Sequence, residues 1–166
     1  MNPLTFVGVP DWRSALLAVA FAAPWLILLA GRWLGRWQTW VVIVAGIVLF
    51  PLSIAWVQVP IQQGINALYL HTLSPETISR YTLLLGVPVI VVSGLVQESV
   101  KFGIAVGGLH LPGVKRAPSA GLAEGADKGI AFGADKGIAF GASAGAGYGG
   151  IEAFWVFNQI FAVGFT

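Results

Sequence analysis

The chain has no cysteine and few charged residues. Its 166 residues include nine Lys or Arg and seven Asp or Glu, so 10% are charged, whereas about a quarter are charged in soluble domains. The absence of cysteine excludes disulfide scaffolds, thiolate metal sites, iron–sulfur clusters and cysteine nucleophiles. The basic residues are scattered, with no run longer than Lys115-Arg116, so nucleic acid is not an expected partner. An ordinary water-soluble globule is therefore excluded.

Long apolar runs take the place of charge in this sequence, and hydrophobic residues make up 57% of the chain. A helix crosses a bilayer core about 30 Å thick with about 20 apolar residues. Four segments are long and apolar enough to do so, namely 14–31, 40–59, 81–109 and 137–166. The sequence predicts an all-α polytopic transmembrane helical bundle of about four spans, which forms a single domain over residues 1–166. We expect a multi-pass protein of the cell membrane, in contact with membrane lipid.

The basic residues of the short loops predict the orientation of the spans. The loops after the first and third spans hold Arg32, Arg36, Lys115, Arg116, Lys128 and Lys136. The opposite side holds only Arg13 and Arg80. Because loops rich in Lys and Arg stay in the cytoplasm, we expect the N-terminus outside the cell and both basic loops inside.

An eight-residue sequence occurs twice in succession. Residues 126–133 and 134–141 both read ADKGIAFG. Eight residues turn a helix by about 80° beyond two full turns, so the two copies cannot present the same face. We interpret the duplicated segment 126–141 as an extension of the cytoplasmic loop, with the fourth span beginning after Lys136.

Three charged residues lie inside the predicted spans, Glu98, Lys101 and Glu152. A charge within a span costs about 2.5–3.5 kcal/mol on insertion scales, so such residues are rare and by default mark function. Glu98 and Lys101 are three residues apart and share a helix face, and Gln97 lies four residues before the lysine. The lysine can therefore neutralise the carboxylate or hydrogen-bond the amide. The alternative is a self-compensated ion pair that only holds the bundle together.

The two glutamates are expected at one depth in the membrane. Glu98 lies eleven residues before the end of the third span at Leu109, and Glu152 lies eleven residues after Gly141. Both separations correspond to about 16 Å along a helix. We predict that the two carboxylates face each other within reach of one shared metal ion, water or proton.

Small and polar residues of the fourth segment predict contacts between helices. Gly141, Gly145 and Gly149 repeat every four residues, a spacing that lets two membrane helices approach closely. The amide side chains of Asn158 and Gln159 are expected to form hydrogen bonds between helices.

Two stretches resemble the motifs of known intramembrane proteases. LVQESVKFG, residues 95–103, resembles the Glu-Glu-x-x-Lys motif of the PrsW-type intramembrane metalloproteases, with Gln97, Glu98 and Lys101 in register. FGASAGAGYGGIEAF, residues 140–154, resembles their second motif, a glycine-rich helix that ends in an aromatic-x-x-x-Glu sequence, here Tyr148 and Glu152. The stretch GYGGIEA is also similar to the YhfC family of intramembrane proteases. Both families are similar to the prenyl-protein CAAX proteases.

The resemblance implies a membrane-embedded, metal-dependent peptidase. In such families the glutamates activate a metal-bound water that hydrolyses a peptide. The resemblance therefore assigns Glu98, Lys101 and Glu152 as catalytic residues, with Glu98 and Glu152 as ligands of a divalent metal, zinc. The implied substrate is a membrane-anchored peptide or protein.

Two departures from these motifs favour a non-catalytic alternative. Gln97 stands at the first glutamate of the motif, and an amide neither takes a proton from water nor binds a metal as a carboxylate does. The third motif, a histidine on a later helix, is absent, and His71 in the outward loop and His110 at the membrane edge cannot reach the glutamates. Because the sequence stops in an apolar run, we expect a piece of a larger bundle that is inactive by itself. The alternative is a carrier or other polytopic protein that uses the three charges to bind a proton, a cation or a helix.

Overall fold

The computed structural model describes residues 11–114 and 126–163, with backbone only at 126–134 and 162–163. Its elements are α1 (Trp12–Ala30), a 3-10 turn η2 (Gly31–Trp33), α2 (Trp37–Ser53), a π-helical turn η3 (Ile54–Gln58), α3 (Val59–Thr72), α4 (Pro75–Arg80), α5 (Thr82–Leu109) and α6 (Ala126–Val163). Within these two ranges every element is helical and no strand occurs. The predicted all-α helical bundle is confirmed.

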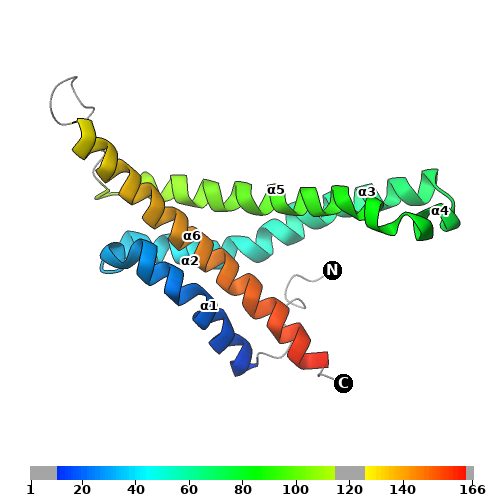
Figure 1. The fold of residues 1–166 in the computed structure, drawn as a ribbon, viewed down its shortest axis with the longest axis horizontal. Helices are drawn as coiled ribbons and strands as arrows, with labels where there is room; N and C mark the ends of the chain where they lie inside the picture. The colour runs from blue at the N-terminus through cyan, green and yellow to red at the C-terminus, as the bar shows by residue number, and fades with distance from the viewer. Residues whose placement is uncertain (1–10, 115–125, 164–166) are drawn as a thin grey trace.

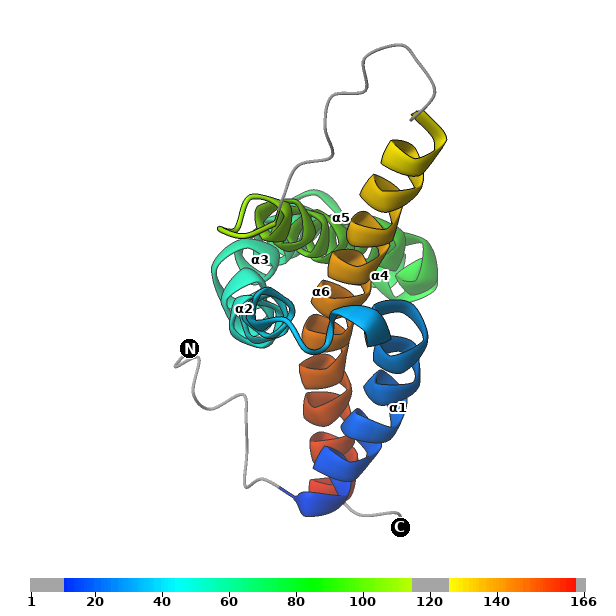
Figure 2. The same cartoon turned by 90° about the vertical axis from the view of Figure 1, so that its left-hand side faces the viewer.

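The helices form two regions that meet where α6 crosses α2 and α5 (Figure 1). In the first region, called here the packed region, α1 lies along α6 and α2 crosses α6. In the second, α3, α4 and the first half of α5 form a projecting hairpin, residues 59–96, whose tip is α4 (Figures 1 and 2). No residue of α3 or α4 is buried.

Three helical segments are long and apolar enough to cross a membrane. They are Trp12–Trp33, Trp37–Thr72 and Thr82–Leu109. The first and third match the predicted spans, but the second runs on well beyond residue 59 and carries His71 in its last turn instead of in a loop. Pro51 and Pro60 stand within this continuous helix, on either side of the π-helical turn η3.

The duplicated octapeptide lies inside α6 rather than in a loop. α6 begins at Ala126, so the backbone of both copies is helical. Neither copy contains proline, so nothing in the segment interrupts the helix. The 16 residues therefore add about 24 Å to the length of α6.

Glycines let α2 and α6 touch backbone to backbone. A Cβ on Gly46 would lie 2.7 Å from the backbone nitrogen of Tyr148, and one on Gly147 would overlap the carbonyl oxygen of Ile43. By contrast, a Cβ on Gly141, Gly145 or Gly149 would meet no atom within 4 Å. The predicted close approach along those three glycines is therefore wrong within this chain. The contact falls on Gly147, on another face of the helix.

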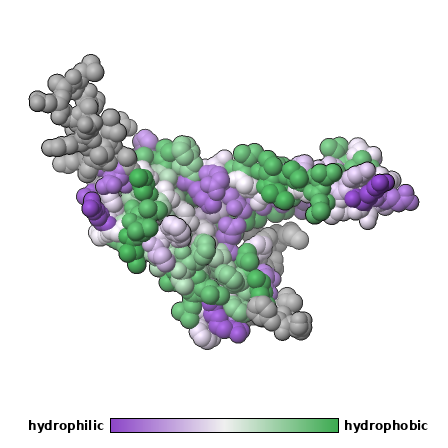
Figure 3. Space-filling view, in the orientation of Figure 1, coloured by the Kyte–Doolittle hydropathy of each residue, from purple (hydrophilic) through white to green (hydrophobic). Residues whose placement is uncertain are grey.

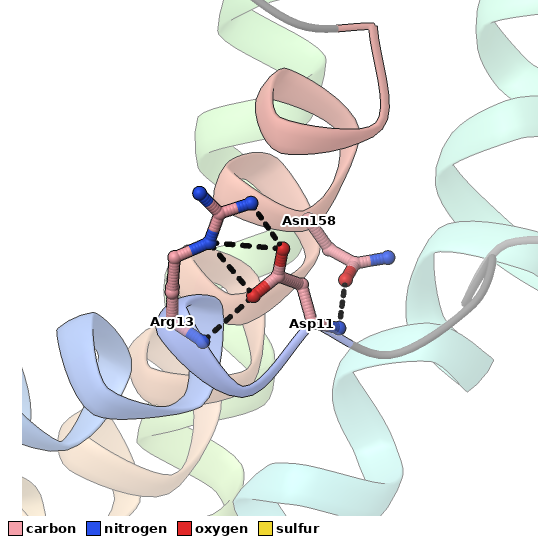
Figure 4. A network of polar contacts seen from close by, with 3 residues as sticks. All are labelled: Asp11, Arg13 and Asn158. Atoms are coloured by element: carbon pink, nitrogen blue, oxygen red, sulfur yellow. Dashed lines mark hydrogen bonds and ion pairs between the residues drawn. The ribbon is translucent and has the colours of Figure 1, made fainter.

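A polar contact, drawn in Figure 4, helps to hold the start of α1 against the end of α6. The backbone N–H of Asp11 donates to Oδ1 of Asn158 at 2.8 Å, and the Asp11 carboxylate caps α1 by accepting from the backbone N–H of Arg13. The prediction that Asn158 bonds between helices is confirmed, whereas Gln159 is exposed. α1 and α6 are therefore antiparallel.

At the opposite end of this helix pair, three segments meet. Trp33, after α1, packs against Ala139 of α6. The Gln38 amide, at the start of α2, donates to the carbonyl of Pro112 just after α5, at 3.0 Å. The loop between α1 and α2 thus lies at the same end of the molecule as the end of α5.

Candidate functional site

The α5 helix carries the ion pair that the sequence predicts. Lys101 Nζ donates to Oε1 of Glu98 at 2.8 Å, across one helical turn. The Lys101 side chain is 24% exposed, whereas that of Glu98 is 74% exposed. The lysine is held against the protein, and most of the carboxylate stays open to a ligand from outside.

Gln97 does not join this pair. Its amide Nε2 donates to the hydroxyl of Ser93, one turn earlier on α5, at 3.3 Å. Of the two roles that the sequence left open for Lys101, the structure shows neutralisation of the Glu98 carboxylate.

Tyr148 of α6 is the residue around which the site is built. It is fully buried, its ring packs edge-to-face on Phe50 at 4.9 Å between centroids, and its hydroxyl hydrogen-bonds Ser53 of α2 at 3.0 Å. Lys101 Nζ lies 5.2 Å from the centre of the same ring, which places a cation over an aromatic face. Tyr148 therefore links the charged turn of α5 to both α2 and α6.

Sequence reasoning placed Tyr148 in the aromatic-x-x-x-Glu motif but gave it no role. The sequence does contain a sign that Tyr148 is important for packing, because it is the one aromatic residue between Gly141 and Ile151, among small residues. A large side chain among glycines fills the space that its neighbours leave open. Its partners on α2, Phe50 and Ser53, could not be inferred from spacing, since they lie about 95 residues away.

Glu152 lies one turn beyond Tyr148 on α6 and is half-buried. The carboxylates of Glu98 and Glu152 both lie near enough to Tyr148 for their charges to act on its phenol. Neither a hydrogen bond nor an ion pair joins Glu152 to Glu98 or Lys101, all of which are described residues. A single shared ion or proton between the carboxylates stays a prediction.

A cavity between α5 and α6 leads to the ion pair and has a volume of about 550 Å³. The α5 side is formed by Glu98, Lys101, Phe102 and Ala105, and the α6 side by Gly137, Gly141 and Gly145. Figure 3 shows hydrophilic surface where α5 and α6 come together, between hydrophobic stretches of both regions. Gly141 and Gly145, which bring no helix close, instead leave room beside the charges.

The charged groups of this site do not by themselves fit a catalytic zinc ion. Such an ion has three protein ligands and one open position. In the described part of the chain no three His, Cys, Asp or Glu side chains are grouped so as to hold a metal. The ring nitrogen Nδ1 of His110 contacts the carbonyl of Val106 at 2.8 Å at the end of α5, and His71 ends α3. Two carboxylates, one of them bound to Lys101, are what the described residues offer.

Searches for related proteins returned no family model, no curated protein and no solved structure that matches this chain. The assignment of the site therefore depends on the contacts described above and on the two sequence motifs.

Proposed function

We propose that this chain is a multi-pass protein of the cell membrane, with its N-terminus outside. Three long apolar helices support membrane insertion. The turn between α1 and α2, which carries Arg32 and Arg36, lies at the same end of the molecule as the end of α5, and this placement supports the orientation that the positive-inside rule predicts. A reporter enzyme fused after Ala117 is expected to be cytoplasmic and one fused after Leu73 external. Both reporters on one side would overturn this topology.

Within that membrane protein, we infer that the α5–α6 site is the carboxylate part of a peptidase site of the PrsW and YhfC type. One observation carries this proposal. Lys101 binds Glu98 of the first motif and also lies over the Tyr148 ring of the second motif, one turn from Glu152. Two motifs that are about 50 residues apart in the sequence thus share a single cation.

Each side chain has a role that follows from its contacts. Lys101 holds the Glu98 carboxylate in place through a hydrogen bond and ion pair of 2.8 Å. Glu152 supplies the second carboxylate. Ser53 fixes the Tyr148 phenol and with it the position of the lysine. The cavity beside Glu98 gives a membrane-anchored peptide access to that carboxylate.

Zinc affinity tests the carboxylate pair, because the described residues offer two ligands and not three. We expect the purified chain to bind zinc weakly and to lose more than about tenfold in affinity in Glu98→Gln and in Glu152→Gln. Glu76→Gln is the matched control, since Glu76 is an exposed acid in the first turn of α4, away from the site. Equal zinc affinity in all three variants would contradict the proposal.

Cleavage of a membrane-anchored reporter tests the peptidase step itself. With two protein ligands, the 166-residue chain is expected to leave the reporter intact. Metal-dependent cleavage that is lost in Glu152→Gln would establish the peptidase directly. Cleavage that is unchanged in Glu152→Gln would overturn the assignment.

A second candidate function is a proton or cation site of a carrier, and the ion pair of Glu98 with Lys101 favours it. A lysine at 2.8 Å already neutralises the carboxylate that a metal would need. This candidate predicts no zinc binding that depends on Glu98, but a change in unfolding temperature with monovalent cation or pH that disappears in Glu152→Gln.

A further inference from the structure

A row of polar side chains follows the seam between α5 and the helix formed by η3 and α3, which lie side by side and antiparallel (Figure 1). The Gln62 amide of α3 donates to the carbonyl of Val89 of α5 at 3.4 Å. One turn further along α5, the hydroxyl of Ser93 accepts from the amide of Gln97 at 3.3 Å. Lys101 of the α5–α6 site follows one turn after Gln97. The row therefore leads from the projecting hairpin to the site.

Contacts between helices do not account for the whole of this row. Polar side chains of membrane proteins commonly form hydrogen bonds from one helix to another, as Gln62 does. The bond of Gln97 to Ser93, by contrast, stays within α5 and joins no two helices. Polar groups inside a segment that is apolar enough to span a membrane are costly unless they have polar neighbours. The middle of the row therefore calls for a polar ligand.

Gln58 of the π-helical turn η3 is a second, independent sign of such a ligand. Gln58 is only 9% exposed, and its side-chain oxygen Oε1 has no hydrogen-bond partner among the described residues. Because the helices are antiparallel and have the same rise per residue, Gln58, one turn before Gln62, lies level with Ser93, one turn after Val89. A buried acceptor without a donor is costly. The missing donor is thus expected beside the middle of the row.

We propose that water molecules occupy this seam from Gln62 to Lys101, and that one of them donates to Oε1 of Gln58. Amide and hydroxyl groups both donate and accept hydrogen bonds, and water does the same and is small enough to lie between packed helices. Water donates to Gln58 without bringing a further charge into the seam.

The seam and the cavity of the α5–α6 site reach the ion pair from opposite directions. The cavity extends from Lys101 toward Leu109 at the end of α5, whereas the seam extends from Lys101 back toward Val89. Hydrolysis of a peptide bond consumes water, so the seam supplies the second reactant of the proposed peptidase. This role rests on the proposed function, whereas the presence of water in the seam does not.

Thiol reactivity in native membranes tests for water in the seam, because a thiol reacts as its thiolate, which an apolar environment disfavours. The chain has no cysteine of its own. With the small reagent methyl methanethiosulfonate, Ser93→Cys and Gln97→Cys are expected to react at least about tenfold faster than Leu95→Cys. Leu95 lies between them in the sequence and is 64% exposed, whereas Ser93 and Gln97 are half-buried. Equal rates, or a faster reaction of Leu95→Cys, would overturn the proposal.

A second experiment tests the water at Gln58. Gln58→Leu is expected to slow the reaction of Ser93→Cys to a rate near that of Leu95→Cys. Gln63→Leu, at an exposed amide of α3, is the matched control and is expected to leave the rate unchanged. An unchanged rate in Gln58→Leu would overturn the proposal.

Two further measurements keep these results separate from misfolding and from the proposed function. Gln58→Leu is expected to unfold in detergent at the wild-type temperature or higher, because it removes a buried acceptor without a donor. All cysteine variants are expected to react alike after denaturation. The thiol reaction needs neither zinc nor cleavage, so the water in the seam and the peptidase can fail independently.

Discussion

The helices of the packed region and the α5 helix, whose first half belongs to the projecting hairpin, have similarly apolar stretches but opposite packing. α1 and the helix from α2 to α3 are as apolar as α5, yet no residue of the most apolar 18-residue window of α5 is buried, whereas a third of the window on the α2–α3 helix is buried. What differs is the presence of small and polar residues at the contacts, such as Gly46, Gly147 and Asn158. In this chain the apolar runs stay largely exposed, and small residues mark contacts between helices.

The largest effect is expected from closing the glycine contact of the packed region. Gly147→Ala places a Cβ against the Ile43 carbonyl, and such overpacking costs about 1–3 kcal/mol of unfolding free energy. Gly141→Ala is the control, because its Cβ would meet nothing within 4 Å; it is expected to be neutral, or to stabilise through helix propensity by up to about 1 kcal/mol. Unfolding in detergent measures both. Equal losses would show that the two glycines do not differ in packing.

A smaller effect is expected from the hydroxyl that joins the site to α2. Tyr148→Phe removes the hydrogen bond to Ser53, and we expect a loss of about 0.5–1.5 kcal/mol. The Ser53 hydroxyl keeps its bond to the Phe50 carbonyl, so no buried donor is left unpaired. Tyr81→Phe, at an exposed position at the start of the hairpin's α5, is the matched control. A loss as large in Tyr81→Phe would contradict the difference between the two regions.

The hairpin is expected to tolerate truncation of its apolar side chains. Leu84 is 67% exposed, so Leu84→Ala creates no cavity and is expected to change the unfolding free energy by less than about 0.5 kcal/mol. Chemical denaturation in detergent is the measurement. A loss of several kcal/mol would mean that a partner or a further contact covers this face.

The smallest expected effect concerns acid and the cap of α1. Hydrogen bonds from Arg13 lower the pKa of the Asp11 carboxyl below its ordinary 3.8. The cap is therefore fully present above that ordinary pKa and is lost as the pH falls through the lower, folded-state pKa. Comparison of wild type with Asp11→Asn from about pH 6 to about pH 3 should show a small acid-dependent difference in unfolding temperature. An advantage of the wild type that grows as the pH falls would have the wrong sign.

The sequence predicts the helices and the charged residues of the site better than it predicts how the helices pack. Hydropathy and the cap at Ser74-Pro75 locate the start of the third apolar segment, and the i to i+3 spacing predicts the bond from Lys101 to Glu98. These features depend on neighbours within one or two turns.

The remaining features depend on long-range contacts that spacing does not contain. The close contact falls on Gly147 and not on the regular series at 141, 145 and 149, because the face of α6 that is in contact depends on where α2 packs against it. The packing of Trp33 against Ala139 and the bond of Tyr148 to Ser53 likewise join distant segments. The helical state of residues 126–141 was missed because a repeat without a periodic apolar face gives no local sign of a helix.

The central claim is that the second half of α5, which carries the first motif, packs against α6, which carries the second motif. The first half of α5 projects away from α6. Because the chain has no cysteine, pairs of cysteines can be introduced without cross-links from native thiols. A short bifunctional thiol reagent applied in native membranes is expected to link Ala105→Cys to Gly141→Cys, which line one cavity. It should not link Leu84→Cys, in the projecting hairpin, to Gly141→Cys. Linkage of the Leu84 pair, or none for the Ala105 pair, would contradict the account.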